Sequence, residues 1–346
     1  MKKCCNVLIG VFIVLTWCVV CNSNSLAAGK PIIIKYGHQL PEAEAVAKQA
    51  RVFAKCMKEK SNGNVEVEVY PAAQLFTARD AFAMVRKGAV DIAAVGSPSI
   101  QESIPFMEIF DVPFLFQTYD QVKGAWYGYP GDVLRTEFDK QGVTFIAEGY
   151  YGFIQLSNSK REIRSPKDLQ GLKIRTVGPL SAELARIMGA AAIVLGGDEA
   201  YLAMARKVVD GSLTGAASMS ARKYWEVQKY VTLTSMGYIG LPLFINSKYM
   251  NGLPIEVQGL VKECAKISED FVLKDTIRDE QDSIVNLAKH GIIVYKPTPE
   301  ELGEFRKVCL PIKEAWIKKQ GEIGAKMVKF VENIIMIIEI PDLTTA

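Results

Sequence analysis

The stretch AMVRKGAVDIAAVG, residues 83–96, has a counterpart later in the chain. AMARKVVDGSLTG, residues 203–215, matches it once one glycine is skipped, and each segment predicts a helix, then Arg-Lys, then a strand that begins with Val-Asp. Such a repeat favours an α/β protein with two lobes built alike, although chance similarity between two amphipathic helices is the alternative. Ligands bind beyond the carboxyl ends of strands in open parallel sheets, so residues 96–97 and 214–215 are expected to face a shared cleft.

The remaining chain alternates short β-rich runs with helical stretches, which is typical of mostly parallel sheets flanked by helices. Ile32–Tyr36 and Val65–Tyr70 predict strands, and Glu42–Glu59 between them predicts an amphipathic helix. Thr298-Pro299-Glu300-Glu301 combines an N-cap threonine, a proline at the first helical position and a glutamate three residues after the cap. A closing helical segment is therefore expected to begin there.

Residues 1–27 have the pattern of a cleaved secretory signal peptide. Two lysines precede an apolar run over residues 7–21, and Ser-Leu-Ala at residues 25–27 forms a small-x-small cleavage site. A membrane anchor is the alternative, but the run is shorter than the roughly 20 residues that a spanning helix needs. A lipoprotein acylated at Cys21 is a weaker alternative, because valine precedes this cysteine where a small residue is expected.

Charge and cysteine content exclude several classes of protein. Loss of residues 1–27 removes two lysines and no acidic residue from 41 basic and 38 acidic residues, so the net charge falls from +3 to +1. Neither a nucleic-acid partner nor a strongly basic membrane-binding surface is implied. Cys56, Cys264 and Cys309 then remain, without a metal spacing or a CxxC pair. Buried thiols or one disulfide fit this pattern, and a pairing of Cys264 with Cys309 is left open.

Sequence signals for catalysis are scarce. The chain has two histidines, His38 and His290, and contains no GxSxG, P-loop, HExxH or GxGxxG pattern. A cysteine and a histidine brought together by the fold stay open as an alternative, but nothing around the three cysteines supports such a pair. His290, beside Gly291, predicts the C-terminal end of a helix. We expect this two-lobed α/β chain to bind a ligand rather than to catalyse a reaction.

Seven motifs follow one another over nearly the whole chain after residue 27. They are VEVYPAAQL (67–75), RKGAVDIAAVG (86–96), EIFDVPFLF (108–116), SPKDLQGLKIRTVG (165–178), VVDG (208–211), YWEVQKYVTLT (224–234) and LPIEVQGLVKE (253–263). In this order they resemble the solute-binding proteins of tripartite ATP-independent periplasmic (TRAP) transporters, in the dicarboxylate-binding-protein (DctP-like) branch. The resemblance implies a type II-like periplasmic binding protein whose two hinged lobes close on a small organic acid and deliver it to the membrane subunits of a TRAP permease. No cofactor is required, and we expect a monomer.

Arg175 lies within GLKIRTVG, residues 171–178, where a permanent cation interrupts a short predicted strand. Period-two alternation puts Arg175 and Ile174 on opposite faces, so the arginine can point to the cleft while Ile174 packs. A guanidinium offers a planar fork that matches the two oxygens of a carboxylate, and a structural ion pair with a neighbouring Asp or Glu is the alternative. The resemblance implies that Arg175 forms the salt bridge to the carboxylate of the ligand.

Other positions depart from the pattern of the family. Thr214 stands where an asparagine is common, and it can still form one hydrogen bond. Ile154 replaces an arginine, and Gly196-Gly197 replaces a Pro-Phe pair. The loss of one cation and one ring argues against a dicarboxylate or a heavily anionic sugar acid, and predicts a monocarboxylate with an apolar or aromatic body. The candidate ligand-binding residues are Arg175, Thr214, Gln155, Ser97, His38, Tyr151, Trp225 and Tyr238, although the aromatic ones could instead belong to the core.

We expect lobe I to comprise residues 28–152 plus 240–280. Lobe II is expected to comprise residues 153–239 plus 281–346, including the C-terminal helices. Two alternatives to a transport protein stay open. One is an extracytoplasmic sensor that hands its ligand to a receptor, and the other is a secreted enzyme on a similar scaffold, favoured only if cysteine or histidine side chains converge in the cleft.

Overall fold

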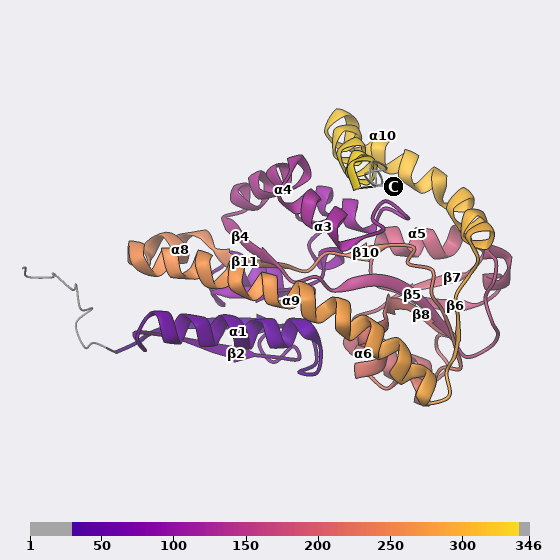
Figure 1. Cartoon of the computed structure of the whole chain (residues 1–346), viewed down its shortest axis with the longest axis horizontal. Coiled ribbons are helices and arrows are strands. Elements are labelled where there is room, and N and C mark those ends of the chain that lie inside the picture. The colour runs from indigo at the N-terminus through magenta and orange to yellow at the C-terminus, as the bar shows by residue number, and fades with distance from the viewer. Residues whose placement is uncertain (1–29, 339–346) are drawn as a thin grey trace, which may run out of the picture.

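The computed structural model describes residues 30–338, which form two β-sheets flanked by helices (Figure 1). The predicted signal peptide, residues 1–27, lies outside the described residues. Across residues 30–338, no helix combines the length and the apolar character that crossing a membrane requires.

The first sheet has the strand order β2-β1-β3-β11-β4. β1 pairs in parallel with β2 and β3, whereas β11 runs antiparallel to β3 and β4. The strands are β1 (Ile32–His38), β2 (Val65–Tyr70), β3 (Ile92–Ala94), β4 (Val143–Glu148) and β11 (Pro242–Asn246). The helices of this half are α1 (Ala45–Lys60), α2 (Ala81–Arg86), α3 (Tyr119–Trp126), α4 (Tyr129–Lys140) and α8 (Ser247–Gly252).

The second sheet has the strand order β12-β9-β5-β8-β6-β7, and a short strand, β10, pairs with β5. β6 pairs in parallel with β7 and β8, whereas β5 runs antiparallel to β8 and β9. The strands are β5 (Gly152–Asn158), β6 (Lys173–Thr176), β7 (Ala191–Val194), β8 (Gly211–Gly215), β9 (Tyr230–Thr232), β10 (Tyr238–Ile239) and β12 (Ile293–Tyr295). The helices of this half are α5 (Pro179–Ile187), α6 (Gly197–Ala205) and α7 (Ala216–Ala221).

The two sheets share one arrangement, because β2-β1-β3-β11-β4 corresponds strand for strand to β7-β6-β8-β5-β9. The repeat found in the sequence supplies equivalent elements to each half, namely α2 and β3 in the first and α6 and β8 in the second. The predicted two-lobed α/β fold is confirmed. Its sheets are mostly parallel, as predicted, and β11 and β5 run against their neighbours.

The direction of β11 and β5 follows from where the chain crosses between the sheets. β4 ends at Glu148 and β5 begins at Gly152, while β10 ends at Ile239 and β11 begins at Pro242. β5 and β11 thus each enter their sheet directly from the other half. The neighbouring strands point their carboxyl ends toward the crossing, so β5 and β11 run in the opposite direction. The two crossings are joined side by side, because Glu148 Oε1 accepts hydrogen bonds from the backbone amides of Tyr150 at 3.2 Å and Leu241 at 2.7 Å.

Two long helices connect the halves near the end of the chain (Figure 1). α9 (Ile255–Lys289) packs against α1 and β4 of the first half and against α7 and β12 of the second. α10 (Pro299–Ile338) contacts α3 and α4 as well as α5, so it touches both halves, although we assigned its residues to lobe II. A break divides α10 at Gly321, whose φ of 64° lies in the left-handed region that glycine tolerates.

Local predictions made from sequence agree with the elements. The strands predicted at Ile32–Tyr36 and Val65–Tyr70 are β1 and β2, and α1 begins at Ala45, since Glu44 is still extended. The predicted cap at Thr298 forms, because its hydroxyl accepts from the amide of Glu301 at 3.3 Å and its own amide donates to the Glu301 carboxylate at 2.8 Å. His290 is the C-cap residue of α9, as predicted.

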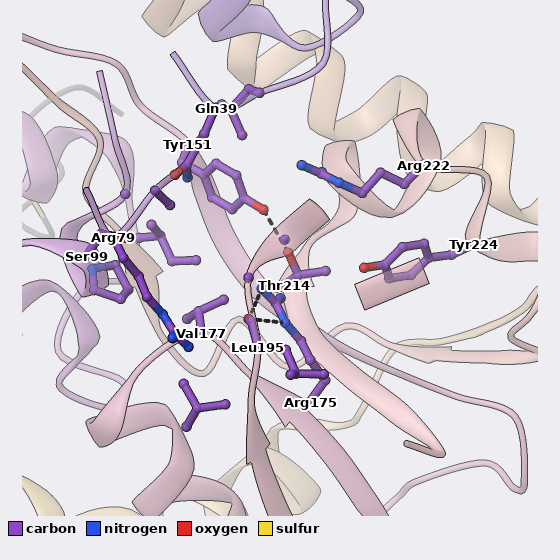
Figure 2. Close-up of a pocket in the computed structure, with 18 residues that line it drawn as sticks. Gln39, Arg79, Ser99, Tyr151, Arg175, Val177, Leu195, Thr214, Arg222 and Tyr224 are labelled. Atoms are coloured by element: carbon purple, nitrogen blue, oxygen red, sulfur yellow. Dashed lines mark hydrogen bonds between the residues drawn. The ribbon is translucent and has the colours of Figure 1, made fainter. Parts of the chain in front are cut away.

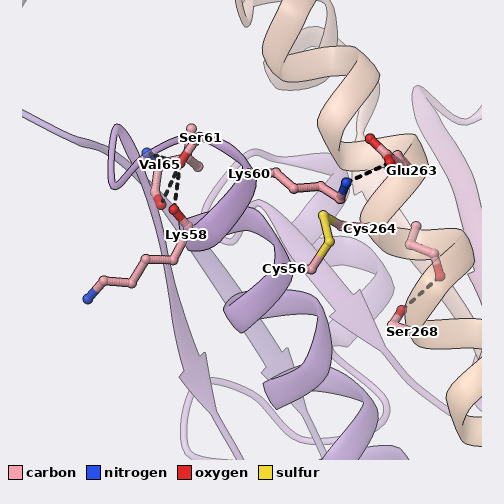
Figure 3. The surroundings of a disulfide bond; sticks show 9 residues. Cys56, Lys58, Lys60, Ser61, Val65, Glu263, Cys264 and Ser268 are labelled. Carbon is pink, nitrogen blue, oxygen red and sulfur yellow. Dashed lines mark hydrogen bonds and ion pairs between the residues drawn. A yellow bond between two sulfur atoms is a disulfide. The ribbon is translucent and has the colours of Figure 1, made fainter.

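A disulfide between Cys56 and Cys264 joins α1 to α9 across a sequence separation of 208 residues (Figure 3). An ion pair between Lys60 and Glu263, at 2.8 Å, connects the same two helices nearby. Cys309 is a buried free thiol, and burial raises its pKa to about 12. One disulfide therefore forms, and the pairing of Cys264 with Cys309 that the sequence left open does not.

Candidate functional site

A cavity lies between the two sheets and takes its lining from both halves of the chain (Figure 2). Its empty space is about 670 Å³, including the part that opens to solvent. The first half contributes Gln39, Leu40, Ala78, Arg79, Gly96, Pro98 and Ser99, and the crossing between β4 and β5 contributes Tyr151. The second half contributes Arg175, Val177, Val194, Leu195, Gly196, Gly197, Thr214, Arg222, Tyr224 and Ile239.

The strands place these residues at the cavity because their carboxyl ends point to it. Gln39 follows β1, and Gly96 lies just beyond β3. Val177 follows β6, Leu195 follows β7, and Thr214 is the last residue but one of β8. Gly96 and Thr214, which the repeat predicted to face a shared cleft, line the same cavity.

Arg175 is nearly fully buried, with 2% of its surface exposed, and its guanidinium is held by the backbone of neighbouring strands. Nε and Nη2 donate to the carbonyl of Leu195 at 3.0 and 2.8 Å, and Nη1 lies 3.5 Å from the carbonyl of Leu213. The Nε/Nη2 edge is thus used, which leaves the Nη1/Nη2 edge for a further acceptor. Burial lowers the pKa of Arg175, but a guanidinium keeps its charge at neutral pH.

The structural ion pair considered for Arg175 does not form. Among residues 30–338, no Asp or Glu side chain is within ion-pair distance of its guanidinium, which contacts neutral carbonyl groups instead. Ile174 on the opposite face of β6 is fully buried in the core, in agreement with the predicted alternation. A buried cation without a counter-charge is costly, and an anion in the cavity would supply that counter-charge.

Two further arginines line the cavity, and the sequence analysis missed both. Arg222 follows α7, and its Nη1 donates to Glu44 Oε1 at 2.8 Å, in a pair whose side chains are both largely buried. Burial alone would lower the pKa of Arg222, but the Glu44 carboxylate raises it. Arg79 precedes α2 and is exposed, and it has no ion pair or hydrogen bond in the part of the chain that the structure describes. Figure 2 shows Arg79 and Arg222 on opposite sides of the cavity.

A chain of hydroxyl groups runs from the cavity to the same carboxylate. The hydroxyl oxygens of Thr214 and Tyr151 are 2.7 Å apart, and Tyr151 Oη donates to Ser218 Oγ at 2.7 Å. Ser218 Oγ then donates to Glu44 Oε2 at 2.8 Å. Burial raises the pKa of Glu44, and Arg222 together with the Ser218 bond opposes this. Glu44 belongs to the first half, so the chain of contacts spans both.

Gly197 leaves the guanidinium groups accessible. It is the first residue of α6, and a Cβ atom built there would lie 3.4 Å from Arg222 Nη2 and 3.8 Å from Arg175 Nη2. Two guanidinium groups from different elements therefore converge on a position without a side chain. The Gly-Gly departure noted in the sequence thus leaves space in the cavity beside these two guanidinium groups.

Three of the eight predicted residues line the cavity, namely Arg175, Thr214 and Tyr151. Ser97 and His38 are fully buried and do not line it, although their neighbours Gly96 and Gln39 do. Burial lowers the pKa of His38 to about 4, so this imidazole is neutral.

The remaining predicted residues are occupied elsewhere. Gln155 does not line the cavity, because its side-chain amide exchanges hydrogen bonds with Ser235 at 3.0 and 3.1 Å. Trp225 stacks on His290, with ring centroids 4.1 Å apart, beside the terminus of α9. Tyr238 is fully buried among aromatic rings, and its hydroxyl donates to Glu148 at 3.1 Å. These three side chains serve packing and the crossing between the sheets.

Solved structures of TRAP periplasmic solute-binding proteins have this fold. One from Sulfurospirillum deleyianum, with bound succinate, is 26% identical and has a TM-score of 0.83, covering 88% of this chain and 99% of that chain. The sugar acid binding protein of Advenella mimigardefordensis, in complex with galactonate, is 25% identical and has a TM-score of 0.84 with the same coverage. The fold and a cavity between two lobes define a solute-binding protein.

Residues 36–320 match the bacterial extracellular solute-binding proteins of family 7, known as DctP, and the chain belongs to this family. A relative, the C4-dicarboxylate-binding periplasmic protein DctP of Rhodobacter capsulatus, is 29% identical over 303 residues, which cover 85% of this chain and 89% of the relative. The resemblance inferred from the seven motifs is confirmed.

Proposed function

We propose that this chain binds a small organic acid in the cavity between its lobes, with the carboxylate of the ligand on the free Nη1/Nη2 edge of Arg175. The observation that carries the proposal is a buried guanidinium that lines the cavity and has no acidic partner among residues 30–338. A carboxylate would supply the missing counter-charge and two acceptors in the geometry that guanidinium prefers. Succinate and galactonate, bound in the related structures, are ligands of this class.

The charge of the cavity changes the ligand predicted from sequence. A monocarboxylate was predicted for a cavity with a single cation, and Ile154 is indeed a buried core residue that adds none. Arg79 supplies a second cation from a different part of the chain, while the charge of Arg222 is balanced by Glu44. Acids with one or two negative charges are therefore both compatible with the cavity, which is a wider class of ligand than the monocarboxylate predicted from the sequence.

The role of the site is binding rather than catalysis. The lining contains no cysteine, histidine, aspartate or glutamate, so the convergence that would have favoured an enzyme does not occur around this cavity within the described residues. His38, the nearest histidine in sequence, is buried beside the lining and neutral. These observations support a carrier that releases its ligand unchanged.

The protein acts in the periplasm, where it hands its ligand to the membrane subunits of a TRAP permease. Membership of a family of extracellular solute-binding proteins supports this assignment, as does the signal-peptide pattern of residues 1–27. Genes for a small and a large membrane subunit beside this one would favour the permease over a receptor that senses the same ligand. N-terminal sequencing of the exported protein tests cleavage after residue 27.

Mass spectrometry of the small molecules released from the purified protein tests the proposal. We expect the released molecule to be a carboxylic acid. Calorimetry is then carried out with this acid, with succinate and with galactonate. We expect at least one of the three to bind the parent and to show no binding to Arg175→Ala at similar concentrations. Release of a neutral or cationic solute, or equal affinity of the parent and Arg175→Ala for the acid, would contradict the proposal.

A further inference from the structure

The hydroxyl chain at the cavity has a fixed direction. We infer that Glu44, acting through Ser218 and Tyr151, orients Thr214 so that its hydroxyl accepts a hydrogen bond from the ligand, and that the bound acid therefore carries a hydroxyl group. This inference rests on the proposed binding of an organic acid at Arg175. Glu44 does not line the cavity, so it is a positioning residue.

The direction is set at Glu44, which is an ionised acceptor. Its two carboxylate oxygens receive separate donors, Oε1 from Arg222 Nη1 and Oε2 from Ser218 Oγ, each at 2.8 Å. Although burial raises the pKa of Glu44, a proton on this carboxyl would leave the buried Arg222 guanidinium without its counter-charge. A carboxylate only accepts hydrogen bonds, so both contacts point their protons at Glu44.

Counting protons then fixes each hydroxyl in turn. A serine or threonine hydroxyl and a tyrosine phenol each carry one proton. Ser218 donates its only proton to Glu44, so its contact with Tyr151 requires Tyr151 to donate. Tyr151 donates its only proton to Ser218, so its contact with Thr214 requires Thr214 to donate. Thr214 has no proton left, and it presents only lone pairs to the cavity that it lines.

This arrangement selects the ligand by the group that meets Thr214. A hydroxyl on the ligand can donate to Thr214, whereas a keto oxygen at the same carbon would bring two acceptors together. Hydroxy acids should bind more tightly than keto acids of the same skeleton, by on the order of tenfold or more, because the keto acid leaves a desolvated acceptor unpaired. The backbone carbonyls of Leu195 and Leu213 already accept from the Arg175 guanidinium, so we assign the selection to Thr214.

Calorimetry with matched acids tests the inference on the full-length exported protein. The probes are D- and L-malate against oxaloacetate, D- and L-lactate against pyruvate, and galactonate against its 2-keto counterpart. The pair with the tightest member is used for all variants. We expect the parent to prefer the hydroxy acid, with a dissociation constant roughly tenfold or more below that of the keto acid.

Glu44→Gln should reverse this preference. The amide oxygen of glutamine can face Arg222 while its NH₂ group donates to Ser218, which frees the Ser218 proton for Tyr151 and the Tyr151 proton for Thr214. Thr214 would then donate to the cavity, and the keto acid should bind as well as the hydroxy acid or better. Ser218→Ala, which removes the link to Glu44, should lower the hydroxy-to-keto ratio to within about threefold of unity, and it keeps the test valid if Glu44→Gln does not fold.

Glu42→Gln is the matched control. Glu42 lies two residues before Glu44 and forms an exposed ion pair with Arg51, away from the cavity lining, so the ratio should stay as in the parent. A parent that prefers the keto acid, or a ratio unchanged in both Glu44→Gln and Ser218→Ala, would overturn the direction of the chain while acid binding stands. If none of the acids, nor the acid released from the purified protein, binds the parent, the proposed function itself fails.

Discussion

Replacing Arg175 with alanine should reduce the free energy of ligand binding by more than it reduces the free energy of unfolding. The guanidinium makes two hydrogen bonds to the carbonyl of Leu195 and a longer contact to that of Leu213, and these hold β6 to its neighbours. Each neutral acceptor left without a donor costs on the order of 1 kcal/mol of folding free energy. The protein should therefore still fold in the Arg175→Ala variant, at a lower melting temperature.

The loss in the free energy of ligand binding should be larger than this loss in folding free energy. The ligand carboxylate would be desolvated in a cavity from which its charge partner has gone, and truncating one side of a buried charge pair costs roughly 2 to 5 kcal/mol. Affinity should fall roughly thirty-fold to several thousand-fold. Arg175→Lys keeps the charge but cannot hold Leu195 with one edge and a carboxylate with the other, so its loss should approach that of alanine. Thr214→Val removes one neutral hydrogen bond and should cost about 1 kcal/mol.

Calorimetry with the acid identified by mass spectrometry measures these losses on variants shown to be folded by thermal unfolding. Arg186→Ala is the control, because this arginine is exposed on α5 and does not line the cavity. Its affinity should equal that of the parent. If Arg175→Ala binds the acid as tightly as the parent does, the guanidinium serves only to join β6, β7 and β8, and the assignment of the site is wrong.

Three further predictions concern the lobes, the disulfide and the crossing. Ligand should reduce the radius of gyration measured by X-ray scattering, because closure brings two masses together, and an identical profile at saturation would argue against hinge closure. Serine at Cys56 and Cys264 should lower unfolding free energy by about 5 kcal/mol in the chain-entropy account and leave affinity within a few-fold, so lost binding by a folded variant would contradict our assignment. Burial raises the pKa of Glu148 to about 8, so its folded form keeps a proton that the unfolded chain loses, and the stability it contributes declines as pH rises from about 5 to 8. Glu148→Gln, which retains the Oε1 acceptor, should gain stability relative to the parent over that range in thermal unfolding, and a constant difference would refute the shift.

The fold could be predicted because its signals are local. The repeat at residues 83–96 and 203–215 combines helix periodicity with a strand start, and both copies form the equivalent α2–β3 and α6–β8 units. The direction of β11 and β5 was not predictable in this way. It depends on where the chain crosses between sheets, which is set by pairing between residues as distant as Leu243 and Ala94.

The site was predictable only where an unusual residue interrupts a strand. Arg175 was found because a cation in β6 conflicts with its apolar surroundings. Arg79 and Arg222 lie in polar stretches next to helices, where an arginine is ordinary, and only the tertiary fold brings them to the cavity. One available signal for Arg222 was its position shortly after the second copy of the repeat.

Two aromatic residues that were predicted to bind the ligand do not line the cavity. Tyr238 and Trp225 can either line a pocket or pack in the core, and the sequence alone does not separate the two environments. The neighbours decide: Tyr238 meets Phe153 and the Glu148 carboxylate, and Trp225 meets His290 from the far end of α9.

The disulfide between Cys56 and Cys264 makes a covalent ring of the chain between them. Sixteen of the eighteen residues that line the cavity lie inside this ring, and Gln39 and Leu40 are the two outside it. A protease that cuts one exposed loop within the ring would leave the two fragments joined, with Arg175, Thr214 and Arg222 still tethered through sulfur. The recognition elements thus survive a single nick in an oxidising compartment, and they separate only when a reductant opens the ring or a second cut frees the segment between.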